Sequence, residues 1–121
     1  MANEISVQCK MTCRNGLLYI AKGTSFSADQ ATAGGGQPGT VAVTTSDAAI
    51  SISGITTPRM AYFRNLGDNP VDIGPTSGGA IVPFARLLPG EAMVVPLKPS
   101  VALRAQTTTS TSTLEIVVLE T

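Results

Sequence analysis

Residues 59–74 read RMAYFRNLGDNPVDIG, and this stretch predicts a β-strand, a tight turn and a second β-strand. Successive side chains of the first seven residues point to alternate faces if that part is extended. In the turn, Gly67 permits a positive φ angle, and Asp68 and Asn69 can hydrogen-bond their own backbone. A proline then begins the returning strand. A strand, corner and strand of this kind indicate a β-rich fold.

The same stretch has a chemical interpretation as a metal or phosphate loop. Asp68, Asn69 and Asp72 offer oxygen ligands, but their spacing differs from the calcium-loop pattern D-x-[DN]-x-[DN]-G. The stretch also lacks the lysine and the following helix of a phosphate-binding loop. Turn geometry explains each residue, so we favour a structural corner over a weak metal site or a catalytic site.

The rest of the chain continues in short extended segments separated by turn residues, with no helical periodicity. Asn15-Gly16 predicts a type I′ hairpin turn, and LPGE (88–91) predicts a type II turn with Pro and Gly at its centre. We therefore predict an all-β fold, an antiparallel β-sandwich or jelly roll, as one domain over residues 1–121. Residues 1–8 are interpreted as an arm and 33–40 as a flexible loop. The predicted strands are 5–13, 17–22, 24–27, 40–45, 49–54, 59–65, 71–74, 81–87, 92–97, 101–106 and 114–120.

Cys9 and Cys13 lie in ISVQCKMTC, where apolar and polar residues alternate strictly. This period of two predicts a half-buried strand with both thiols on its core-facing side. Four residues along a strand span about 13 Å, which is too far for a disulfide. We predict two buried, unpaired thiols, and the absence of histidine makes a zinc site unfavourable.

Composition argues against several function classes. Lysine and arginine number eight, as do aspartate and glutamate, and basic residues do not cluster, so we expect no nucleic-acid partner. The chain has no histidine and no serine-nucleophile motif, so we expect no enzyme activity, cofactor or small-molecule substrate. Neither a secretory signal nor an apolar run of about 18 residues is visible, so we expect synthesis in a cytoplasm and no membrane partner.

The second half of the chain resembles small virion proteins of tailed bacteriophages. The resemblance rests on YFRNLGDNPVDIG, on PFARLLPGEAMVVPL and on the terminal LEIVVLE, although LLPGE carries an extra leucine and RNLGDN lacks some aspartates of the pattern. It implies a β-sandwich or jelly-roll virion component and provides no catalytic residues. The function implied is that of a capsid decoration (cement) protein.

We therefore expect a homo-oligomer, dimer or trimer, on the outer surface of the head, made in the host bacterial cytoplasm. It would stabilise the head by bridging copies of the major capsid protein. The alternatives are a tail, neck or head-fibre component, including a receptor-binding one, and a carbohydrate-binding β-sandwich, which the scarcity of Trp and Tyr disfavours.

The expected contacts come from the N-terminal strand, the 33–40 loop, isolated arginines and the Thr/Ser-rich segment 106–113. A single arginine on a strand more often pairs with a surface or interface carboxylate than with a nucleic acid. The candidate contact residues are Ile5, Val7, Gly35, Gly36, Gln37, Arg59, Arg64, Arg104, Thr108 and Thr109.

Overall fold

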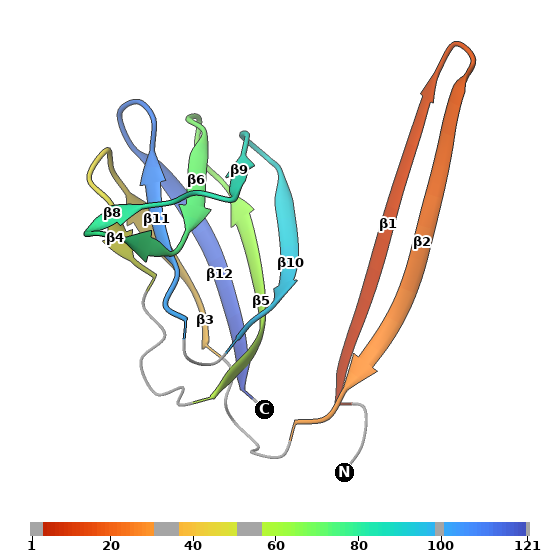
Figure 1. Ribbon diagram of the computed structural model, residues 1–121, viewed down its shortest axis with the longest axis horizontal. Coiled ribbons are helices and arrows are strands. Elements are labelled where there is room, and N and C mark those ends of the chain that lie inside the picture. Colours follow the sequence, from red (N-terminus) through yellow and green to blue (C-terminus); the bar gives the residue numbers. More distant parts are fainter. Residues whose placement is uncertain (1–3, 31–36, 51–56, 99–100, 121) are drawn as a thin grey trace. The chain divides into compact units, whose positions relative to one another are not determined.

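The computed structural model describes residues 4–30, 37–50, 57–98 and 101–120, and these residues form an all-β, antiparallel fold (Figure 1). No helix in the described part of the chain is long and apolar enough to cross a membrane. The sequence predicted one domain over 1–121, whereas the chain divides into two compact units, Met1–Ala33 and Gly34–Thr121.

The first unit contains one long hairpin. Strand β1 (Ile5–Asn15) pairs with β2 (Leu18–Ala28) along its whole length, from Ile5 opposite Ala28 to Asn15 opposite Leu18. The loop is therefore Gly16-Leu17, one residue later than predicted. Only Gly16 has a positive φ angle, +58°, so the turn is type II′ and the predicted type I′ turn is wrong. Of the predicted N-terminal arm, residues 5–8 are paired with β2 in this hairpin, and residues 1–3 lie outside the described residues.

The second unit contains two four-stranded antiparallel sheets and one small hairpin. The first sheet has the order β10-β5-β12-β3, and the second has the order β4-β11-β6-β9. The small hairpin pairs β7 (Thr76–Ser77) with β8 (Ala80–Ile81). The bounds of the sheet strands are β3 Gln37–Val43, β4 Ala48–Ala49, β5 Pro58–Asn65, β6 Val71–Gly74, β9 Ala85–Leu87, β10 Ala92–Pro96, β11 Arg104–Thr107 and β12 Ser112–Glu120.

Several predicted boundaries change. Residues 37–40 of the predicted flexible loop belong to β3 and pair with β12, and residues 33–36 lie outside the described residues. The predicted strand 81–87 is split, with Pro83 between β8 and β9, because proline has no N–H for a ladder bond. Most of the predicted strand 49–54 lies outside the described residues.

One cluster of buried side chains takes residues from both four-stranded sheets. Strand β12 shows why, since alternate residues from Ser112 to Glu120 are buried and the residues between them are more exposed. This period of two puts three apolar side chains of β12 into the cluster. Phe63 of β5 and Ile73 of β6 are its largest fully buried members. The cluster comprises Val43, Ile50, Ala61, Phe63, Val71, Ile73, Leu87, Ala105, Leu114, Ile116 and Val118.

The corner between β5 and β6 connects one sheet to the other. The predicted turn is confirmed as a corner, but its two strands belong to different sheets and are not paired with each other. Gly67 is required here for space, not for the positive φ angle that we predicted. A Cβ atom on Gly67 would lie 2.8 Å from the main-chain nitrogen of Thr113. The corner therefore packs closely against the start of β12.

Candidate contact surfaces

Asn65, at the end of β5, organises the corner and is completely buried. Its Nδ2 donates to the main-chain oxygens of Asn69 at 2.8 Å and Leu87 at 2.9 Å. Its Oδ1 accepts from the Gly67 N–H at 3.0 Å and from the Ser112 hydroxyl at 2.7 Å. One side chain thus joins the corner to the end of β9 and the start of β12. Both amide hydrogens and the amide oxygen are satisfied.

This corner is one of four loops at the same end of the second unit, which are 44–47, 66–70, 88–91 and 108–111 (Figure 1). The Asn69 side chain joins two of them, since its Nδ2 donates to the Thr111 main-chain oxygen at 2.7 Å and its Oδ1 accepts from Thr109 at 3.3 Å. Ser110 has a φ angle of +53°, and its carbonyl accepts from the Thr107 hydroxyl at 2.6 Å. We call these four loops the loop end, which is mostly exposed and mainly polar, with Leu66 and Leu88 as exposed apolar side chains.

The predicted type II turn at 88–91 is confirmed. Gly90 has a φ angle of +86°, and the Glu91 N–H donates to the Leu88 carbonyl at 2.9 Å. The Gly90 N–H donates to the Asn65 carbonyl at 2.9 Å, and the Asn65 N–H donates to the Glu91 carbonyl at 3.0 Å. The turn is therefore fixed to the end of β5.

Gly90→Ala is expected to lower the free energy of unfolding by about 1–2 kcal/mol, because a Cβ disfavours this left-handed backbone. No atom lies within 4 Å of the added Cβ, so the cost arises in the backbone alone. Gly39→Ala is the matched control, since Gly39 also has open space but no positive φ angle. Urea denaturation should show Gly39→Ala unchanged or slightly stabilised, and equal losses in both variants would contradict the backbone explanation.

Two of the three proposed oxygen ligands, Asn69 and Asp72, have structural partners. Asp72 of β6 forms a two-point ion pair with Arg86 of β9, with Nε to Oδ1 at 2.6 Å and Nη2 to Oδ2 at 3.0 Å. The Asp72 carboxylate raises the pKa of Arg86 through this hydrogen bond and its charge. The side chain of Asn69 is used within the loop end, and Asp68 is exposed. Among the described residues, no group of three His, Cys, Asp or Glu side chains is arranged to hold a metal ion.

The candidate contact residues predicted from the sequence do not form one surface. Thr108 and Thr109 lie exposed at the loop end, and Arg64 is exposed near it on β5. Arg104 pairs with Asp47 at 3.2 Å, which is the surface salt bridge expected of an isolated arginine. Arg59 lies near the opposite end of β5, where its carbonyl accepts from the Leu97 N–H.

The remaining candidates lie between residues 5 and 37, in the hairpin or at the start of the second unit. Ile5 and Val7 are buried at the open end of the hairpin, with 4% and 6% of their surface exposed, so they are not exposed contact residues. Gln37 begins β3. Gly35 and Gly36 lie outside the described residues.

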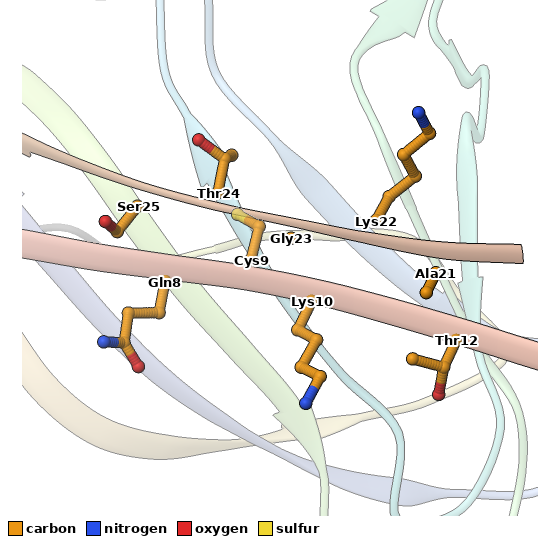
Figure 2. Close-up of a pocket in the computed structure, with 9 residues that line it drawn as sticks. All are labelled: Gln8, Cys9, Lys10, Thr12, Ala21, Lys22, Gly23, Thr24 and Ser25. Carbon is orange, nitrogen blue, oxygen red and sulfur yellow. The ribbon is translucent and has the colours of Figure 1, made fainter.

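The β1–β2 hairpin has one apolar and one polar face, because directly opposed residues share a face and alternate along each strand. We call the side that carries Cys9, Met11, Cys13, Leu18, Ile20, Lys22, Thr24 and Phe26 the hairpin apolar face; Ile5, Val7, Asn15 and Ala28 share it. The other side carries Ser6, Gln8, Lys10, Thr12, Arg14, Tyr19, Ala21, Gly23, Ser25 and Ser27. Figure 2 shows this separation, with Gln8, Lys10 and Thr12 on one side of β1 and Cys9 on the other.

Most of the hairpin apolar face is exposed. Met11 is 65% exposed, Leu18 50%, Ile20 40% and Phe26 38%. Cys9 and Cys13 are unpaired, as predicted, but they are exposed, so the predicted burial is wrong. The alternation correctly predicted which side chains share a face.

A shallow hollow of about 390 Å³ follows the middle of this hairpin around Gly23 (Figure 2). Its lining includes Lys10 and Thr12 from the polar face and Cys9 and Thr24 from the apolar face, and every lining residue is exposed. A small-molecule site normally encloses most of its ligand. The hollow is therefore part of the exposed surface of the hairpin and not a ligand pocket.

Comparisons of the chain with protein-family models, with curated proteins and with solved structures found no match. Two candidate contact surfaces remain, the loop end and the hairpin apolar face.

Proposed function

We propose that this chain is a structural virion protein that decorates the outer surface of a bacteriophage head. In this role it is a non-enzymatic homo-oligomer, dimer or trimer, that bridges neighbouring major capsid subunits and stabilises the shell. The observation that carries the proposal is a hairpin with 11 residues in each strand, largely exposed and apolar on one face, in a chain whose second unit has its own core. Such a hairpin is suited to assembly, because burial of its exposed apolar face against another surface would stabilise it.

The strand order supports a finer description of the second unit as a jelly-roll β-sandwich. The eight strands of the two larger sheets can be numbered 1 to 8 in chain order. One sheet then reads 1-8-3-6 and the other 2-7-4-5. This is the strand order of a jelly roll, an architecture that recurs in viral capsid proteins and lectins. The shared core of the two sheets fits the same description.

A tail, neck or head-fibre component is the second candidate within a virion, and a carbohydrate-binding β-sandwich is the candidate from another class. The resemblance of residues 62–120 to small virion proteins favours a virion component. The polar loop end offers backbone and hydroxyl groups for contacts with a larger surface. Few aromatic side chains are present for stacking on a sugar ring, which disfavours carbohydrate binding.

A reconstruction of the intact particle tests this proposal. We expect many copies of the chain, distributed over the shell at positions between major capsid subunits. A particle that loses these copies should break at a lower temperature than the decorated particle, because the bridging contacts are gone. A few copies at one vertex would instead assign the chain to the neck or tail, and absence from the particle would overturn the proposal.

A further inference from the structure

The hairpin apolar face is exposed over most of its length. It carries four exposed large apolar side chains and two thiols along one side of the ribbon, while the opposite side is mainly polar. We propose that this face is a self-association surface, which packs against the same face of the hairpin in a second copy of the chain. The inference deepens the homo-oligomeric part of the proposed function, and it does not depend on a capsid.

The hairpin needs a covering layer. A two-stranded ribbon alone is at best marginally stable in water, and stable sheets have more strands or an apolar face that is packed. Ile5 and Val7 are buried at the open end, but on the same face the cross-strand pairs from Cys9–Thr24 to Asn15–Leu18 are exposed. Covering these exposed side chains would therefore stabilise the hairpin.

The position of the apolar side chains favours a protein surface over a lipid bilayer. Residues 5–28 contain Lys10, Arg14 and Lys22 and no acidic residue, which by charge alone would suit an anionic membrane. The apolar groups, however, follow one face along the strands and do not gather only at the tip. Close to the tip, Arg14 lies opposite Tyr19, with its guanidinium 5.8 Å from the ring centroid. Insertion deeper than the turn would bury this charge.

The chemistry of the face suits a second copy of itself. Its described residues include one charged group, Lys22, opposite Met11. A lysine can place its aliphatic stem on an apolar surface and its ammonium group in water at the ribbon edge. Two such faces therefore meet without leaving an unpaired charge buried.

The size of the face predicts how strong this association is. Eleven residues at about 3.3 Å each give a ribbon about 36 Å long. With a width of about 10 Å, the flat face covers about 360 Å², which is below the roughly 800 Å² per partner of a standard interface. We therefore expect a concentration-dependent equilibrium that a single charged substitution abolishes.

The native thiols report on this association without any mutation. We expect Cys9 and Cys13 to react with a maleimide at least about tenfold more slowly at high protein concentration, because the face is covered in the oligomer. Sedimentation velocity on the same samples, in reducing buffer before labelling, should show the monomer converting to a dimer as concentration rises, because a face that packs against itself forms a closed pair. A monomer at every concentration, with fully reactive thiols, would overturn the proposal.

Two neighbouring substitutions distinguish the faces. Ile20→Lys places a charge on the hairpin apolar face, and Ala21→Lys places the same charge one residue later on the polar face. We expect Ile20→Lys to be monomeric with reactive thiols, and Ala21→Lys to associate like the native chain. Circular dichroism and the unfolding transition of the second unit check that both variants fold.

Each outcome has a defined meaning. Association that survives Ile20→Lys, or that leaves the thiols reactive, would place the contact elsewhere on the chain and overturn this inference. Binding to vesicles of anionic phospholipid by a monomer with reactive thiols would also overturn it. None of these experiments uses a particle, so their failure is separate from a failure of the reconstruction described above.

Discussion

Replacing Asn65 with alanine is expected to lower the free energy of unfolding by about 3–5 kcal/mol, the range for disruption of a buried hydrogen-bond network. The substitution removes four hydrogen bonds, to Asn69, Leu87, Gly67 and Ser112. It also leaves two carbonyl oxygens without their donor in a region where Asn65 itself has no exposed surface. Urea denaturation followed by circular dichroism measures the effect.

Asn69→Ala is the matched control, because it removes an amide of the same size from the same corner. Its Nδ2 makes one short bond, to Thr111, in a more exposed position. We expect a loss of about 1 kcal/mol or less, as for an exposed hydrogen bond. Equal losses for the two variants would show that Asn65 does not have the organising role that its contacts indicate.

Asn65→Asp adds a pH dependence to the same prediction. An ionised carboxylate at this site would face the Asn69 and Leu87 carbonyl oxygens in a buried position, so we expect its pKa in the folded protein to be raised above that in the unfolded chain. The variant should then lose stability as pH rises through that pKa, because only the unfolded chain ionises readily. Native protein and variant compared at acidic and neutral pH test this, and a pH-independent difference would contradict it.

The part of the fold that the sequence predicted well depends on local chemistry. Pro89 and Gly90 favour a type II turn whatever the surrounding tertiary structure, and the structure has that turn. The hairpin turn was placed one residue too early. Gly16 can occupy either the first or the second position of a two-residue hairpin loop. Only the pairing of the two strands along their whole length shows that it occupies the first.

The part that the sequence did not predict depends on residues far apart in the chain. Asn65 bonds to Leu87 and Ser112, which are 22 and 47 positions away. An asparagine before a turn signals only the turn itself, so its wider role was missed. The exposure of Cys9 has the same kind of cause, because a period of two shows which side chains share a face and not what covers that face.

Removing residues 1–33 is expected to leave a folded second unit that has lost self-association. All eleven residues of the shared core lie between Val43 and Val118, so the deletion removes no member of that core. The shortened chain should keep a single cooperative unfolding transition in urea, as expected for one small domain. Its association constant should fall by at least about 100-fold, because the hairpin apolar face is gone.

The two readouts of this deletion separate two roles of the hairpin. A shortened chain that is folded and monomeric would identify the hairpin as an assembly element, and it should also fail to compete with the native chain for a bare particle. An unfolded product would show that Met1–Ala33 is needed for the stability of Gly34–Thr121. Full-length Ile20→Lys is the control, because it keeps every residue of the hairpin and changes only its apolar face. If the shortened chain is folded and still associates, the contact lies on the second unit, where the loop end is the next surface to test.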